Sequence, residues 1–139
     1  MLYDARTPKE IPMTIAEFCL PAAVLLALLP IGWAKAIGRR SFDNARPREA
    51  SFYASGIRAR LHGAHLNGIE AFPFFAAAVI VAEFRGAGQE WIDALAVAFV
   101  LCRLLYICAY AADRATLRSV LWAAGLAVNA AIFFLPLRG

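Results

Sequence analysis

The chain has 139 residues, of which 62% are hydrophobic and only 17% are charged. The apolar share of an ordinary globular protein is about 45–50%, and a chain this short cannot hide so much apolar surface in one water-soluble core. Lipid is therefore the expected solvent. The formal net charge of +4 comes from basic residues that flank apolar segments without any RNA- or DNA-binding module, so we expect no nucleic-acid partner.

The first apolar segment covers residues 11–33, which is long enough to cross a hydrocarbon core of about 30 Å, since this needs roughly 20 helical residues. It holds Pro21 and Pro30, which transmembrane helices tolerate better than soluble helices do. Asp4 and Glu10 interrupt the basic leader that a cleavable signal needs. We therefore expect this first span to stay in the protein.

Three further spans follow. They are predicted over residues 56–83, 91–112 and 117–137. The second becomes strongly apolar only from Gly68, so its helix is expected to project beyond the membrane. The Gly-Ala-Gly sequence at 86–88 predicts a tight turn, and the alternation of a transmembrane β-barrel is absent. The sequence thus predicts one all-α domain over residues 1–139, an integral membrane four-helix bundle.

Basic residues are distributed unevenly among the segments that join these spans. Ten lie between the first and second spans or near the turn between the third and fourth: Lys35, Arg39, Arg40, Arg46, Arg48, Arg58, Arg60, Arg103, Arg114 and Arg118. Four lie toward the opposite side: Arg6, Lys9, Arg85 and Arg138. Because basic loops stay cytoplasmic, both termini are expected to face away from the cytoplasm.

Two of the predicted helices carry a narrow polar stripe near the cytoplasmic side. At about 100° per residue, four residues of the second helix fall within an arc of about 80°: Arg60, Asn67, Glu70 and Phe74. The third helix has polar residues at i, i+3, i+7 and i+10: Arg103, Tyr106, Tyr110 and Asp113. Ionisable groups within spans usually face the bundle interior and are functional candidates. Two hypotheses remain open, a ligand site and a structural lock in which Glu70 pairs with Arg103.

Other polar residues in the spans have simpler interpretations. His62 and His65 fall outside the polar arc, and two ligands without a third are weak evidence for a metal site, so we expect none. Glu17 and Asn129 are expected to form interfacial or helix-to-helix hydrogen bonds. The cysteines lie in apolar helix without ligand spacing and are expected to be buried small hydrophobes: Cys19, Cys102 and Cys108.

Three motifs together resemble those of a known family. The run "RLHGAHLNGIEAFPFF" at 60–75 is followed by "RLLYICAY" at 103–110 and "LRS" at 117–119. This series resembles the MAPEG family, the membrane-associated proteins in eicosanoid and glutathione metabolism, and "FDNARPRE" at 42–49 is similar to the first cytoplasmic loop of bacterial members. The resemblance covers residues 33–119 and implies four-helix subunits that assemble as homotrimers, here in a bacterial inner membrane.

The resemblance also implies a site for glutathione, as a co-substrate, between neighbouring subunits at the cytoplasmic end. The positions that match the family's binding motifs are Arg60, Asn67, Glu70, Arg103, Tyr106 and Tyr110. Arg118 matches the arginine that activates the thiol, with Ser119 beside it. Arginines can hold the peptide's carboxylates, Glu70 can hold its ammonium group, and a cation near the sulfur favours the thiolate.

Two positions depart from the family pattern. Gly63 stands where glutathione-using members carry an arginine, and Ala59 stands where an acidic residue is usual. Three functions therefore remain as hypotheses. The first is a glutathione-dependent transferase or peroxidase acting on a lipophilic electrophile, which Arg118 and Ser119 favour. The second is a membrane protein that binds a lipid or an anionic small molecule without turnover, which Gly63 favours. The third is a trimer in which the polar stripes serve only assembly.

Overall fold

The computed structural model describes residues 12–138, and within this range the chain forms helices and no strand. Its elements are α1 (Ile15–Ile37), a 3-10 helix (Ala50–Tyr53), α2 (Gly56–Phe84), α3 (Gln89–Ala111), α4 (Ala115–Phe134) and a second 3-10 helix (Leu135–Arg138). Four helical segments are long and apolar enough to cross a membrane. The prediction of an all-α, four-helix membrane fold is confirmed.

The largest difference in bounds concerns α1, which lies four residues later at each end than the predicted span 11–33. The reason is a capping box, in which the Glu17 N–H donates to Thr14 Oγ1 (3.1 Å) and the Thr14 N–H donates to Glu17 Oε2 (2.7 Å). This box satisfies N–H groups that have no partner within the helix, so the helix begins after Thr14. Glu17 thus caps its own helix at the end of the span, so of the two expected kinds of hydrogen bond it forms no helix-to-helix bond here.

The turns after α2 and α3 have the same backbone geometry. Gly86 lies just beyond α2 with φ of 69°, and the following Ala87 N–H donates back to the Ala82 carbonyl (3.0 Å). This is the Schellman arrangement, which favours glycine because the left-handed region is crowded for residues with a Cβ. After α3 the equivalent residue is Asp113, with φ of 58°. A non-glycine residue in this conformation needs stabilising contacts, and these come from Arg60, as described below.

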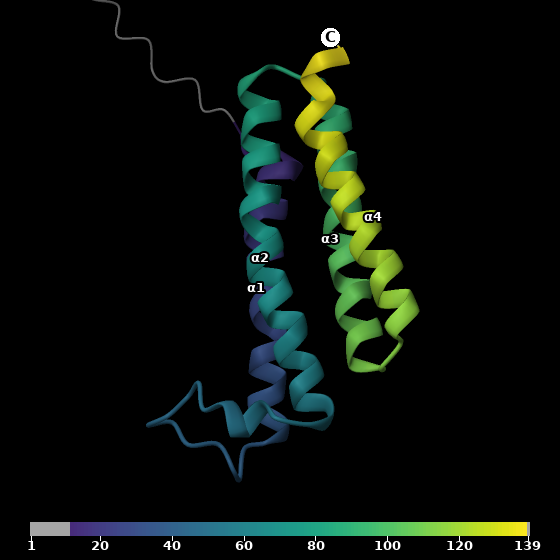
Figure 1. The fold of residues 1–139 in the computed structure, drawn as a ribbon. Coiled ribbons are helices and arrows are strands. Elements are labelled where there is room, and N and C mark those ends of the chain that lie inside the picture. The colour runs from purple at the N-terminus through teal and green to yellow at the C-terminus, as the bar shows by residue number, and fades with distance from the viewer. Residues whose placement is uncertain (1–11, 139) are drawn as a thin grey trace, which may run out of the picture.

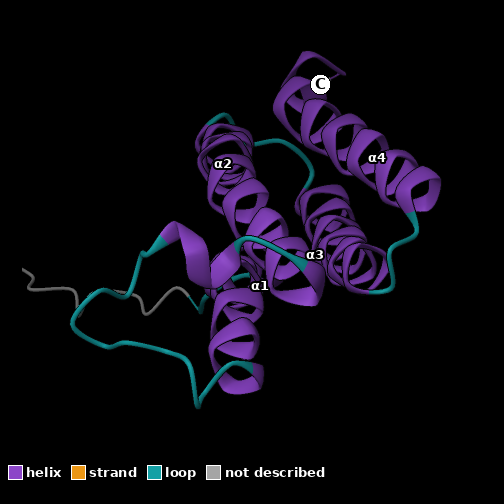
Figure 2. Cartoon of the chain, turned by 60° about the horizontal axis from the view of Figure 1, so that its bottom comes forward, coloured by secondary structure: helices purple, strands orange, loops and turns teal. Residues whose placement is uncertain are grey.

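The four helices form a bundle in which α2 packs along α1 and α3 packs along α4 (Figure 1). Viewed from the loop end, α2 and α3 lie between α1 and α4 (Figure 2). Away from the long α1–α2 loop, the core is centred on the stacked rings of Phe75 and Phe99, whose centroids are 4.1 Å apart. The loop end has its own smaller cluster, made by Ala34, Phe52, Tyr53 and Leu61.

Helices α1 and α2 approach closely where both carry small residues. A Cβ atom built on Gly68 would lie 2.9 Å from the Cα and the Cβ of Ala27. One turn away, the His65 ring nitrogen Nδ1 lies 2.7 Å from the Ala27 carbonyl oxygen. Small residues allow such backbone contact between membrane helices, so Gly68 fixes the distance between α1 and α2.

We expect Gly68→Ala to destabilise the protein by about 1–3 kcal/mol, because the added methyl group meets backbone atoms that cannot yield without moving α1. Gly32→Ala is the matched control, since a Cβ there meets nothing within 4 Å and alanine favours helix. Thermal unfolding of both variants in the same detergent checks this. Equal changes in melting temperature would show that the contact at Gly68 has no special importance.

Candidate functional site

Arg103 is the most deeply buried charged residue of the described chain, with 6% of its surface exposed. Its Nη2 donates to Asn67 Oδ1 across the α2–α3 contact (2.9 Å), and its guanidinium carbon lies 4.3 Å from the centroid of the Tyr106 ring. Within residues 12–138 no carboxylate comes close enough to form an ion pair with it. Within one chain, therefore, Arg103 forms its hydrogen bond with Asn67, and the ion pair with Glu70 that the structural-lock hypothesis expected is not formed.

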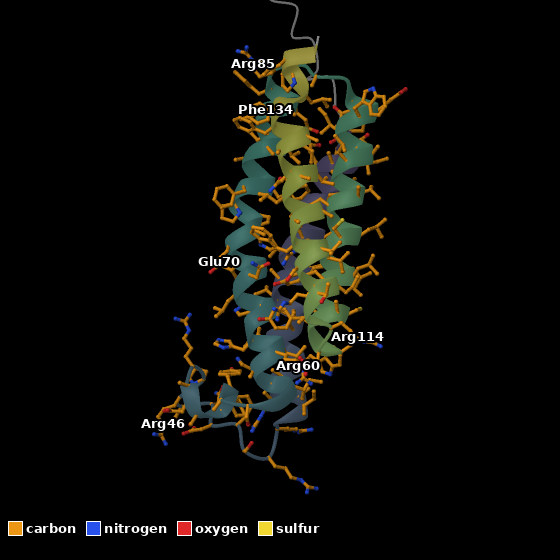
Figure 3. All side chains as sticks on the ribbon, turned by 45° about the vertical axis from the view of Figure 1, so that its right-hand side comes forward. Arg46, Arg60, Glu70, Arg85, Arg114 and Phe134 are labelled. Atoms are coloured by element: carbon orange, nitrogen blue, oxygen red, sulfur yellow. The ribbon has the colours of Figure 1, made fainter. Side chains whose placement is uncertain are left out.

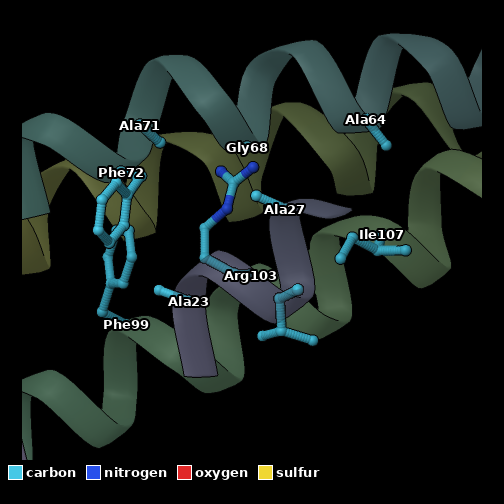
Figure 4. A pocket seen from close by; sticks show the side chains of 10 residues that line it. Ala23, Ala27, Ala64, Gly68, Ala71, Phe72, Phe99, Arg103 and Ile107 are labelled. Carbon is cyan, nitrogen blue, oxygen red and sulfur yellow. The ribbon is translucent and has the colours of Figure 1, made fainter. Parts of the chain in front are cut away.

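Small residues on α1 and α2 make room for this guanidinium. Figure 4 shows Arg103 reaching from α3 toward Gly68 of α2, with Ala23 and Ala27 of α1 beside it. The gap that remains has a volume of about 10 Å³, which is close to the minimum for one water molecule. The arginine head is thus held in a fitted space, and its position is defined by all three helices.

A second arginine, Arg118, continues the line of contacts that begins with Asn67, Arg103 and Tyr106. The Arg118 guanidinium carbon of α4 lies 4.6 Å from the centroid of the Tyr110 ring of α3. The Tyr110 and Tyr106 rings meet edge to face at 5.6 Å. The contacts therefore run without a break from Asn67 on α2, through Arg103, Tyr106 and Tyr110 on α3, to Arg118 on α4. Five of the eight predicted site residues are brought together in this row.

Gly63 has a role that the sequence analysis missed. A Cβ built at this position would lie 2.4 Å from the Tyr110 hydroxyl oxygen and 2.8 Å from its Cζ atom. Any side chain here would displace the phenol, so glycine is what lets Tyr110 lie against α2. The space beside Gly63 is therefore filled from α3 by a tyrosine. The sequence contained the glycine, but nothing in it placed Gly63 opposite Tyr110.

Arg60 and Ser119 stand apart from the row of contacts. Arg60 Nε donates to the Ala111 carbonyl at the end of α3 (3.2 Å), and its Nη1 lies 3.7 Å from Asp113 Oδ2. It therefore caps the C-terminus of α3 and supports the left-handed turn at Asp113. The Ser119 hydroxyl is exposed and donates to the Ala115 carbonyl of its own helix (3.1 Å).

Glu70 lies at mid-height on α2 (Figure 3), at a cavity of about 210 Å³ between α2, α3 and α4. Asn67, Arg103 and Asn129 also line this cavity. Asn129 is 6% exposed, and its Oδ1 has no hydrogen-bond partner among residues 12–138. The structure therefore shows no helix-to-helix hydrogen bond for this oxygen among the described residues.

The two histidines lie on the side of α2 that faces α1 and the long loop. There a cavity of about 710 Å³ is lined by basic and aromatic residues together with apolar ones. The Tyr53 and His62 rings stack at 4.5 Å, and the Tyr53 hydroxyl donates to the Pro47 carbonyl (3.1 Å). Burial raises the pKa of Tyr53, which keeps it in the donating form. Together with His62, Lys35 and Arg48 form a basic surface. This surface is separate from the row of contacts that contains Arg103 and Arg118, which we call the Arg103–Arg118 row.

Comparison with known proteins gives one match. A family model described as the MAPEG family matches residues 16–138, which include all four long helices. No curated protein and no solved structure matches the chain. The matched region also contains the whole row from Asn67 to Arg118. The chain therefore belongs to the MAPEG family and is an integral membrane protein of the eicosanoid and glutathione metabolism type.

Proposed function

We propose that this protein is a glutathione-dependent transferase or peroxidase that acts on a lipophilic electrophile entering from the bilayer. The observation that carries the proposal is the half-buried Arg118, stacked on Tyr110. Within the described residues Arg118 has no ion-pair partner. A half-buried guanidinium that has no counter-anion among the described residues favours an anionic ligand such as a thiolate.

The remaining residues are assigned by charge. Arg103 and Tyr110 hold the peptide, with Arg103 and arginines of the basic loop available for its two carboxylates. Glu70 receives its ammonium group, and Arg118 stabilises the sulfur as thiolate. Ser119 donates to the sulfur only after leaving the Ala115 carbonyl. In a transfer reaction the thiolate forms a bond to an electrophilic carbon of the acceptor, the bond from that carbon to a leaving group breaks, and the leaving group departs as an anion with the electron pair. The proton that the thiol lost on binding passes to water.

The site is proposed to be completed by a neighbouring subunit in a homotrimer. A closed ring brings unlike faces of identical subunits together, and each subunit has two unlike polar faces near the same end. One is the Arg103–Arg118 row, and the other is the basic surface of Lys35, Arg48 and His62. Glutathione would lie between them, with α2 and α3 nearer the axis and Glu70 at a subunit boundary.

The trimer predicts a protein mass of three chains when light scattering is corrected for bound detergent. The physical reason is that a single subunit leaves an open basic cavity of about 710 Å³. It also leaves the buried Arg103 without a carboxylate partner among residues 12–138. A mass of one chain in a mild detergent, with the protein still helical, would contradict the trimer and the shared site together.

Calorimetric titration of the detergent-solubilised protein with reduced glutathione tests the proposed function. We expect saturable heat, and in buffers of different ionisation enthalpy a net proton release at neutral pH, because the thiol binds as thiolate. S-methyl glutathione is the matched control, since it binds without an ionisable thiol and releases no such proton. If there is neither binding nor proton release, the glutathione-dependent enzyme is wrong, and the second candidate function described next is favoured.

That second candidate is a membrane protein that binds an anionic small molecule without turnover. The specific observation behind it is Gly63, where Tyr110 fills the position of the family's arginine. Losing one charge-assisted hydrogen bond costs on the order of 1.5–3 kcal/mol, or about 10- to 150-fold in affinity. Binding of an anion with no thiolate and no turnover would support this candidate over the enzyme.

The proposed location is the bacterial inner membrane, with both termini outside the cytoplasm. Arg46, Arg60 and Arg114 gather at one end of the bundle, and Arg85 lies at the other (Figure 3). Arg6 and Lys9, which the charge count also used, lie outside the described residues. We expect a cysteine at position 46 to react with an impermeant reagent only after the membrane is opened. A cysteine at position 85 is the control and should react from outside. The reverse pattern would contradict this topology.

A further inference from the structure

The end of the bundle that carries the long α1–α2 loop has more positive charge than its own carboxylates balance. Residues 35–60 contain seven basic and two acidic residues. Both carboxylates, Asp43 and Glu49, pair with Arg46 (3.3 and 3.8 Å), and Arg60 pairs with Asp113. This end is therefore open to an anionic partner. Among residues 12–138, no carboxylate lies within ion-pair distance of the other five cations: Lys35, Arg39, Arg40, Arg48 and Arg58.

Three of these arginines meet where α1 ends. Arg39 and Arg40 follow the helix directly after its C-cap, Gly38, and both are exposed. Arg58 comes from the start of α2, and its Nη1 donates to Ser41 Oγ (3.1 Å). A Cβ built on Gly38 would lie 3.1 Å from the same Nη1, so this guanidinium lies against the backbone next to Arg39. Two segments of the chain thus bring cations to one place.

Arg58 is held in position without any negative charge. Its guanidinium carbon lies 4.6 Å from the centroid of the Phe52 ring. Phe52 is buried, and a Cβ built on Gly38 would lie 2.5 Å from its ring, so the ring packs directly on the end of α1. A cation that is held by an aromatic ring and a hydroxyl group keeps its charge available for an anion. Arg58 therefore presents a positioned guanidinium beside Arg39 and Arg40.

These arginines lie at the level where lipid headgroups meet the helices. Helix α1 is long and apolar enough to cross a membrane, and the arginines follow its last turn. Trp33 and Ile37, near the same end of α1, are exposed, and tryptophan is typical of the interface between membrane and water. Basic clusters just outside a membrane helix attract anionic lipids. A lipid phosphate is therefore the anion that this cluster can reach.

We propose that Arg39, Arg40 and Arg58 form a binding site for the headgroup of an anionic phospholipid, whose acyl chains lie along the end of α1. Arginine binds phosphate oxygens through paired N–H groups. Phosphatidylglycerol has a net negative charge, whereas phosphatidylcholine carries its own ammonium group, so the unpaired cations favour the former. Lys35 and Arg48, which line the proposed glutathione face, are not part of this site. The proposal holds whether or not glutathione binds.

Quenching of tryptophan fluorescence by brominated lipid measures this preference. Replacing Trp91 and Trp122 by phenylalanine leaves Trp33 as the only tryptophan, within about 9 Å of Arg39 along the helix axis. The protein is reconstituted in mixtures of phosphatidylglycerol and phosphatidylcholine in which one or the other lipid carries brominated acyl chains. We expect the association constant at Trp33 to be about fivefold higher for phosphatidylglycerol at low salt. Because both leaflets contain the brominated lipid, the orientation of the protein does not affect the result.

Two controls separate this site from a general effect of charge. A protein with Trp91 as its only tryptophan reports on the opposite end of the bundle, where the two lipids should bind equally. Replacing Arg39 and Arg40 together by glutamine should remove the preference at Trp33. Arg114→Gln removes a cation at the same end of the bundle (Figure 3), at the start of α4, and should leave the preference unchanged.

Equal association constants of the two lipids at Trp33 would overturn the proposal, and so would a preference of the same size at Trp91. A preference that survives the double replacement of Arg39 and Arg40 would also contradict it. If inorganic phosphate abolishes the preference at constant ionic strength, the arginines bind free phosphate, and the lipid site is wrong.

Discussion

Replacing Arg118 by leucine is expected to lower turnover at neutral pH by about tenfold for each unit by which the pKa of the bound thiol rises. The guanidinium favours the thiolate, so its loss moves the thiol pKa upward toward the value of free cysteine, roughly 8.5. The thiolate fraction at pH 7 then falls, while glutathione binding changes less. The ultraviolet absorbance of the bound thiolate, followed against pH in both proteins, measures this directly.

The sign of the pH dependence distinguishes this role from a structural one. Because the variant's thiol ionises only at higher pH, its activity should recover as the pH rises through 8 to 9, while the wild type stays nearly constant. Arg118→Lys keeps the charge and should retain most of the thiolate signal. Glu70→Gln is the matched variant for binding, and should weaken glutathione affinity more than the chemical step. No thiolate signal in the wild type at saturating glutathione would rule out the enzyme.

Much of the fold followed from the sequence because lipid imposes simple requirements. Long apolar segments must be helices that satisfy their own backbone hydrogen bonds, so the four spans and the turn at Gly86 were predictable. The bounds of α1 were not, because Thr14 and Glu17 form a capping box that outweighs the apolar residues before them. Its start is also tied to α3, where Asp93 Oδ1 accepts from the Ala16 N–H (2.8 Å), and no local pattern contains such a contact.

The sequence could predict only those parts of the candidate site whose residues are spaced along one face of a single helix. The spacing of Arg103, Tyr106 and Tyr110 on one face of α3 correctly placed these three residues in one row. Periodicity on α2 grouped Arg60 with Asn67, but the structure uses Arg60 to cap α3, because the end of α3 lies beside it. The contact of Gly63 with Tyr110 joins residues on different helices. Spacing along one helix holds no information about which residue lies opposite on the next.

Replacing Arg103 by methionine together with Asn67 by leucine should separate the ligand-site hypothesis from the structural-lock hypothesis. Among residues 12–138, Arg103 is a buried cation with one side-chain hydrogen bond and no carboxylate partner. Removing both members of a buried polar pair is close to neutral for folding and can be stabilising. We therefore expect the free energy of unfolding to change by less than about 1 kcal/mol. Glutathione affinity should fall by about 10- to 150-fold, because a charge-assisted hydrogen bond is lost.

The single variant Arg103→Met provides the control. It leaves the half-buried Asn67 Oδ1 without its donor, so it should be less stable than the double variant by about 1–3 kcal/mol, while both lose affinity equally. Thermal unfolding and glutathione titration of the same preparations measure the two effects separately. A structural lock predicts the opposite combination, because Arg103 would then pair with Glu70 of a neighbouring subunit. In that case both variants would lose the trimer in light scattering, and the ligand role of Arg103 would be wrong.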